Sequence, residues 1–206
     1  MTGKNTDFHQ NIVASEAGNM QKFTLRSGGR IIDLHTPKVM GIINLTPDSF
    51  YQSSGRHHEL PSTNQVLKEA EKHLLEGAYF LDLGGYSSRP GAEHVSEKEE
   101  AQRVLPAVKV LAKEFPEALI SVDTFRSEIA KKSVNEGAHL INDISAGQLD
   151  ERMFETMANL QVPYILMHLK GTPQTMQNLA NYNDLVPEVL SYFSEKLSHL
   201  KQLGAK

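Results

Sequence analysis

Short apolar runs alternate with longer segments of helical periodicity through most of the chain. The first run, VMGIIN, is typical of a buried parallel strand, and the segment after it repeats apolar residues at helical spacing. The same alternation recurs and predicts strands at residues 39–44, 79–85, 119–124, 139–145 and 163–169. Helices are predicted at residues 62–76, 96–113, 127–137, about 150–160 and 184–203. Strands and helices in this order predict β/α units on a parallel sheet.

Two further segments precede the first of these units. Residues 22–25 and 31–34 flank a Gly-Gly pair and predict a β-hairpin. Residues 1–21 lack both the basic and the apolar region of a signal peptide, and we expect them to form a flexible N-terminal extension. Residues 22–206 are interpreted as one domain, because no linker or low-complexity segment interrupts them.

Composition narrows the classes of protein to consider. With 39% hydrophobic and 22% charged residues, the 206-residue chain is ordinary globular material with enough length for a sizeable core. A net charge of -4 gives no reason to expect a nucleic-acid partner, and no apolar stretch approaches the ~18 residues of a membrane span. The chain has no cysteine, which excludes disulfides, thiolate metal sites and cysteine nucleophiles and fits the cytoplasmic location that we expect.

Polar residues gather where the predicted strands end. In parallel α/β folds, ligands bind at the carboxyl ends of the strands. The chain places there Asn44, Asp82, Asp123, Asn142 and Met167-His168. A buried carboxylate must be hydrogen-bonded or paired, so the convergence predicts a polar ligand with many donors. Taken singly, Asp123 or Asn142 could instead cap a helix or loop, and His168 is interpreted as a packed histidine.

Two loops at the same edge carry further candidate chemistry. The loop after the first strand reads TPDSFYQSSGR. The loop after the second reads SSRPG, where Arg89 and two hydroxyls beside glycine suit an anionic ligand, although Arg-Pro-Gly is also an ordinary turn.

The pattern of strands and helices alone leaves two architectures open. Five strands suit a doubly wound sheet, and they equally suit the first part of an eight-stranded (β/α)₈ barrel.

The segments VMGIINLTPDSF, FLDLGGYSSRPGAE, ISVDT, GAHLINDIS and YILMHLKGTPQTMQ occur in this order. With the leading hairpin, they resemble the N-terminal portion of the dihydropteroate synthase family of folate synthesis, over roughly residues 22–204. The resemblance implies a (β/α)₈ TIM barrel, here only its first five β/α units behind an N-terminal β-hairpin. It also implies an enzyme that joins p-aminobenzoate to 6-hydroxymethyl-7,8-dihydropterin pyrophosphate, with Mg²⁺, and releases pyrophosphate.

The resemblance also implies roles for individual residues. Asn44 would help to hold the Mg²⁺–pyrophosphate, Asp123 and Asn142 would bind the pterin, and Met167 would pack on its face. Asp82 and Asp123 would be the catalytic carboxylates that stabilise a pterin cation. The two loops would contact pyrophosphate and p-aminobenzoate through Thr46, Asp48, Ser49, Phe50, Ser88, Arg89 and Pro90. Ser88 replaces the threonine usual in the family and keeps the hydroxyl.

The family's later elements have no counterpart in these 206 residues. They are an Asp-Pro-Gly-Phe-Gly segment, a Ser-Arg-Lys segment and an Arg-x-His segment on strands six to eight. We therefore expect a C-terminally incomplete barrel with unpaired edge strands, inactive by itself, and a homodimer only in the full-length protein. Two alternatives remain open: a methyl-tetrahydrofolate-binding methyltransferase barrel, and a truncated inactive chain with at most weak pterin binding.

Overall fold

The computed structural model describes residues 23–47, 60–87 and 94–206, so the predicted extension at 1–21 lies outside the described residues. The hairpin strands are β1 (Thr24–Ser27) and β2 (Arg30–Asp33). The parallel strands are β3 (Val39–Asn44), β4 (Ala78–Gly84), β5 (Leu119–Asp123), β6 (Leu140–Asp143) and β7 (Tyr164–Leu166). The helices are α3 (Thr63–Leu75), α4 (Glu97–Glu114), α5 (Ser127–Asn135), α6 (Met153–Leu160) and α7 (Leu185–Gln202). Every predicted strand and helix is present, with small differences at the ends.

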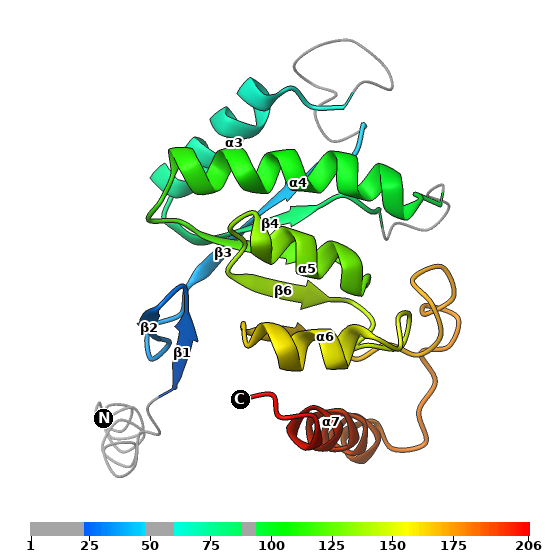
Figure 1. Cartoon of the computed structure of the whole chain (residues 1–206). Helices are drawn as coiled ribbons and strands as arrows, with labels where there is room; N and C mark the ends of the chain where they lie inside the picture. The colour runs from blue at the N-terminus through cyan, green and yellow to red at the C-terminus, as the bar shows by residue number, and fades with distance from the viewer. Residues whose placement is uncertain (1–22, 48–59, 88–93) are drawn as a thin grey trace, which may run out of the picture.

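The five parallel strands lie side by side in chain order, β3-β4-β5-β6-β7. A doubly wound sheet reverses its strand order at a switch point, whereas a barrel adds each strand beside the previous one. Consecutive helices also contact one another from α3 to α7, which places them on the same side of the sheet. Figure 1 shows α4, α5 and α6 following one another along that side. The order therefore favours the barrel over the doubly wound sheet.

The two faces of the sheet are chemically different because side chains alternate along each strand. The helix-covered face supplies the main core, with Ile43, Leu81, Leu83, Ile120, Val122 and Ile141. These side chains pack against apolar residues of the helices such as Val104, Val108 and Leu111 of α4. Burying each large apolar side chain stabilises the fold by roughly 1.5–3 kcal/mol. The opposite face carries Asp82, Ser121, Asp123 and Asn142.

The two helices that follow the loops at the polar edge each begin at a serine N-cap. The hydroxyl of Ser96 accepts the Glu99 N–H at 3.2 Å, and the Glu99 carboxylate accepts the Ser96 N–H at 2.9 Å. This is the capping box that the sequence of residues 96–99 predicts. Ser62 and Gln65 form the same arrangement at the start of α3. Both helices therefore begin at fixed points behind the polar edge.

The hairpin closes the amino end of the sheet, at the lower left of Figure 1. Ile32 packs with Phe80 and Leu119 in a second apolar cluster. The Ser27 hydroxyl donates to the carbonyl of His139 at 2.8 Å. Gly28 has a φ of 55° and lies so close to the His139 ring that a Cβ would meet it at 2.6 Å, so only glycine fits this turn. The hairpin therefore packs against the amino ends of β4 and β5.

The edge strands of the described sheet, β3 and β7, carry exposed apolar side chains. Ile42 is 61% exposed and Ile165 is 38% exposed, although both face the interior side of the sheet. Helix α7 likewise exposes Leu185, Val186, Leu190 and Leu197. The expected unpaired edges are thus present in the described part of the chain. Within that part, no helix is both long and apolar enough to cross a membrane.

The last strand is shorter than the predicted 163–169. The Met167 N–H still donates to the carbonyl of Asp143 at 3.2 Å, which continues the strand geometry by one residue. The carbonyls of Met167 and Leu169 then accept hydrogen bonds from the side chains of Tyr192 and Gln148 instead of a neighbouring strand. The ladder ends because these side chains replace the backbone partners.

Candidate active site

The register of the sheet aligns most of the predicted site residues. The top row of the polar face, one residue from each strand, is Asn44, Gly84, Asp123, Asn142 and Ile165. The row below it is Ile42, Asp82, Ser121 and Leu140. All of these side chains face away from the helices because they alternate with the core residues. The structure therefore brings together the predicted Asn44, Asp82, Asp123 and Asn142 at the carboxyl end of the sheet.

Asp82 lies at the centre of this arrangement and is only 5% exposed. Its carboxylate accepts hydrogen bonds from the Ser121 hydroxyl at 2.5 Å and from the Asn142 amide at 3.1 Å. Burial raises the pKa of Asp82 above its ordinary value, and the two hydrogen bonds offset part of that rise. The same bonds fix the carboxylate and orient the Asn142 amide. Ser121 was not predicted from the sequence, although its position two residues before Asp123 places it on the same face.

Asp123 has a different environment from Asp82. In the described part of the chain, its carboxylate has no hydrogen-bond partner, and burial raises its pKa to about 7. The nearby carboxylates of Asp82, Glu100 and Asp143 add to the rise because like charges disfavour ionisation. A ligand that offers N–H groups would satisfy this carboxylate and stabilise its charged form. Asp123 is therefore the residue of the site that most needs a ligand.

Gly84 keeps the space open between two of the predicted residues. A Cβ on Gly84 would lie 3.7 Å from Oδ2 of Asp123 and 3.8 Å from Oδ1 of Asn44. Both side chains therefore border the same small space above β4. Asn44 itself is exposed at the end of β3, where an oxygen ligand would be accessible to a cation.

A family of proteins described as "Pterin binding enzyme" matches residues 40–206. The chain belongs to this family. Dihydropteroate synthase of Escherichia coli K12 is 43% identical over 176 residues, which cover 85% of this chain and 60% of that protein. The Yersinia pestis dihydropteroate synthase, solved as a sulfonamide drug complex, has a TM-score of 0.79 at 38% identity. The Xanthomonas albilineans dihydropteroate synthase, solved with 4-aminobenzoic acid, has a TM-score of 0.76 at 35% identity.

The two solved structures match most of this chain but less of their own. The Yersinia pestis alignment covers 89% of this chain and 64% of the relative, and the Xanthomonas albilineans alignment covers 90% and 63%. The chain thus spans less than two thirds of the length of each of these relatives. The similarity confirms the predicted barrel fold, of which the described sheet is the first five strands.

The structure describes only some of the remaining predicted site residues. Met167 follows β7, on the face that Ile165 shares with Asn142, and is 37% exposed. Thr46 is half-buried just after β3. Six loop residues lie outside the described residues, and their predicted roles stay predictions: Asp48, Ser49, Phe50, Ser88, Arg89 and Pro90. His168 packs against aromatic rings, with the Tyr192 ring centroid 4.6 Å away, which confirms that it is a packed histidine.

Asp143 has a separate role from its neighbour Asn142. It is fully buried on the helix side of the sheet, where it accepts the N–H groups of Ser145 and Gly147 and the hydroxyl of Tyr164. Its bond from Tyr164 is 2.5 Å long. Asp143 therefore shapes the loop after β6, while Asn142 lies on the opposite face, where its amide donates to Asp82. The sequence places both at the strand end but does not separate these roles.

The candidate metal ligands that the structure describes at these strand ends are oxygen donors, on Asn44, Asp82 and Asp123. No group of three or more His, Asp or Glu side chains is arranged to hold a metal among the described residues. Mg²⁺ commonly takes one or two protein oxygens and completes its shell with phosphate oxygens and water. The Asn44 amide, close to Asp123 across Gly84, fits that limited requirement.

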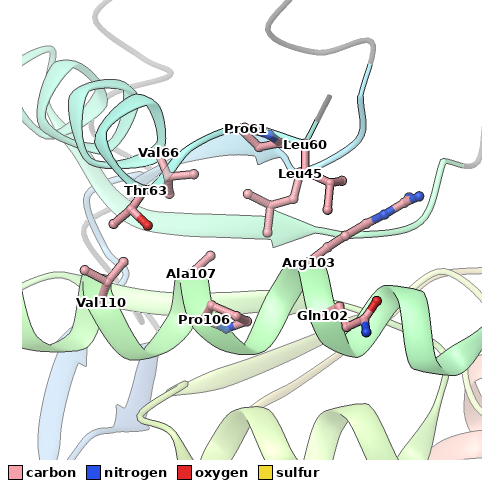
Figure 2. A pocket seen from close by; sticks show the side chains of 10 residues that line it. All are labelled: Leu45, Leu60, Pro61, Thr63, Val66, Gln102, Arg103, Pro106, Ala107 and Val110. Atoms are coloured by element: carbon pink, nitrogen blue, oxygen red, sulfur yellow. The ribbon is translucent and has the colours of Figure 1, made fainter. Parts of the chain in front are cut away.

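A hollow between α3 and α4 lies on the other side of the sheet. Figure 2 shows Leu45, Val66, Pro106 and Ala107 among the side chains that line it. Leu45 and Val66 belong to the main core, which faces away from Asp82 and Asp123. We therefore place the site at the carboxyl ends of the strands and not in this hollow.

Proposed function

We propose that the full-length protein is a dihydropteroate synthase. It would join p-aminobenzoate to 6-hydroxymethyl-7,8-dihydropterin pyrophosphate and release pyrophosphate. The observation that carries the proposal is that two carboxylates lie on one face of the sheet: Asp82, which accepts the Asn142 amide, and Asp123, which has no hydrogen-bond partner among the described residues. The amino-pyrimidinone edge of a pterin carries N–H groups, which the Asp123 carboxylate would accept. Met167 would then pack on the pterin ring.

The same residues suit the chemistry of the transfer. The bond from the pterin CH₂ group to the pyrophosphate oxygen breaks, and its electron pair leaves with pyrophosphate. The nitrogen of p-aminobenzoate forms the new bond to the CH₂ group and loses one proton to solvent. Positive charge develops on the pterin as the bond breaks, and the carboxylates of Asp82 and Asp123 would stabilise it. No general base of the Ser-His-Asp kind is needed.

The leaving group and the second substrate would be held at the rim. Asn44 would ligate Mg²⁺, which when bound neutralises charge on pyrophosphate. We propose that Thr46, Asp48, Ser49 and Phe50 on one loop and Ser88, Arg89 and Pro90 on the other contact pyrophosphate and p-aminobenzoate. The relative solved with 4-aminobenzoic acid supports the identity of the second substrate. We further propose that the full-length enzyme is a cytoplasmic homodimer without nucleic-acid or membrane partners.

The test is an assay of the full-length protein with both substrates and Mg²⁺. We expect one pyrophosphate released for each dihydropteroate formed, and no product when either substrate is omitted or when EDTA removes the metal. Residues 1–206 alone, assayed in parallel, are expected to be inactive because the edges β3 and β7 are unpaired. Pterin binding by the full-length protein without pyrophosphate release would overturn the proposal and favour a methyl-tetrahydrofolate-type barrel.

Pterin affinity is expected to depend on pH through Asp123. The pKa of this carboxyl is raised to about 7 by burial, by the carboxylate of Asp82 on the same face of the sheet, and by those of Glu100 and Asp143 on the helix side. The ionised Asp123 carboxylate can accept N–H groups from the ligand directly. The protonated carboxyl must first lose its proton. Affinity should therefore rise from about pH 5.5 to about pH 8.5, with its midpoint near the pKa of the ligand-free protein. Calorimetric titration with 6-hydroxymethylpterin across this range measures it, and a flat profile would show that Asp123 is not the pterin acceptor.

A further inference from the structure

A buried charged cluster lies behind the site, on the helix side of the sheet. Glu100, in the first turn of α4, is 0% exposed. Its carboxylate accepts the Thr124 hydroxyl at 2.6 Å and a very short hydrogen bond from the Arg126 guanidinium. This cluster was not predicted from the sequence, since a glutamate in the first turn of a helix is typical of a solvated surface position.

Thr124 connects this cluster directly to the site. It follows Asp123 at the end of β5, so the two side chains leave the backbone on opposite faces. Besides donating to Glu100, the Thr124 hydroxyl accepts the Arg126 N–H at 3.2 Å. The Thr124 N–H donates to the carbonyl of Asn142 at 3.0 Å. The backbone that carries Asp123 is therefore fixed both to α4 and to β6.

Arg126 extends the cluster to the neighbouring rim segments. Its second guanidinium nitrogen donates to the carbonyl of Val95 at 2.6 Å, just before α4. The guanidinium also lies 5.5 Å from the ring centroid of Tyr86, which follows Gly84 by two residues. The Tyr86 hydroxyl in turn accepts the Gln174 amide at 3.1 Å, from the segment after β7. The cluster thus joins the ends of β4 and β5 to segments near α4 and after β7.

A purely stabilising purpose is a poor explanation for this arrangement. A buried ion pair contributes little net stability compared with apolar side chains of the same size, because desolvation offsets the attraction. The hydrogen bonds of the cluster instead fix the positions of atoms in the turn that bears Asp123. Binding sites need such support to hold a side chain to within about 0.5 Å of its productive position.

We propose that Glu100, Thr124 and Arg126 form a positioning unit for the Asp123 carboxylate. The inference rests on the proposed function, because the position of Asp123 matters only if this carboxylate binds the pterin. None of the three residues would touch the substrate. Their effect would be on how well the ligand-free site is preorganised, and hence on the affinity for the pterin.

The test compares Thr124→Val with Thr124→Ser in the full-length protein. Valine keeps the shape but loses the hydroxyl, whereas serine keeps the hydroxyl. Calorimetric titration with 6-hydroxymethylpterin, well below the melting temperature of each variant, should give a Kd about tenfold higher for valine. Serine should stay within about twofold of the wild type. The control is Glu136→Gln, which removes an exposed ion pair with Lys109 that also joins α4 and α5 and should stay within the same twofold.

Each outcome decides the inference. If Thr124→Val lowers the melting temperature but leaves the Kd of the folded protein unchanged, the cluster is only structural and the proposal is wrong. If the valine variant does not fold, Arg126→Lys takes its place. Lysine keeps the charge but cannot bridge Glu100 and the Val95 carbonyl, so the same rise in Kd is expected and its absence refutes the proposal. If the wild type itself binds no pterin, the proposed function fails and this inference fails with it, a result that no variant can mimic.

Discussion

Replacing Asp123 with asparagine is expected to lower kcat/KM of the full-length protein about 100-fold. Asparagine has nearly the same shape, so the row across the strand ends should persist. It cannot carry the charge that would stabilise the pterin cation, and its amide group places a donor where the pterin also presents donors. Steady-state kinetics with both substrates measure the loss. Asp184→Asn, on an exposed carboxylate without a capping bond at the start of α7, serves as the control and should stay within about twofold.

The same variant tests the pH argument independently. Because burial raises the pKa of Asp123 to about 7, its ionisation is the change that pterin affinity should follow near neutral pH. Asp123→Asn should therefore give weak binding that no longer varies with pH. If Asp123→Asn kept wild-type activity, or if its binding kept the wild-type pH profile, Asp123 would not be the pterin acceptor. Asp82 would then be the next carboxylate to test.

The sequence predicts the scaffold well because its periodicities are regular. Runs such as VMGIIN have the length and composition of buried strands, and Ser96 with Glu99 marks the start of a helix. Parallel strands carry their carboxyl ends to one edge, so Asn44, Asp123 and Asn142 could be grouped without knowledge of any contact. The register of the sheet confirms that grouping. These inferences succeed since each depends on local pattern or on a general rule of topology.

Contacts between distant residues were not accessible in the same way. Ser121 donates to Asp82, and Glu100 pairs with Arg126, yet nothing in either local sequence indicates a partner. Asn142 and Asp143 are adjacent in the sequence, but the pleat of β6 turns one toward the site and the other toward the helices. The end of β7 depends on side chains of Tyr192 and Gln148 that approach from elsewhere in the chain. Such features follow from packing, which a reading of periodicity does not include.

Replacing Arg126 with methionine is expected to lower the free energy of unfolding by about 3–5 kcal/mol. Glu100 has no exposed side-chain surface and Arg126 is 11% exposed, so the substitution would leave a buried carboxylate without its counter-charge. Denaturant unfolding of the full-length protein near neutral pH measures the loss. The control is Lys109→Met, whose ion pair with Glu136 is largely exposed, and there the expected change is below about 1 kcal/mol.

The loss in Arg126→Met is expected to shrink as the pH falls. Burial already raises the pKa of Glu100, and the Arg126 charge opposes that rise, so removing the arginine should raise the pKa further. A carboxyl whose pKa is higher in the folded than in the unfolded protein costs stability as the pH rises through that folded pKa. The loss of unfolding free energy should therefore be larger at about pH 8 than at about pH 5, where Glu100 takes up a proton.

Combining Glu100→Gln with Arg126→Met should recover part of the lost stability at the higher pH, because glutamine leaves no unpaired buried charge. A deficit that is equal at both pH values and is not relieved by Glu100→Gln would mean that Arg126 stabilises the fold through its contacts with Tyr86 and Val95 and not through the buried charge of Glu100.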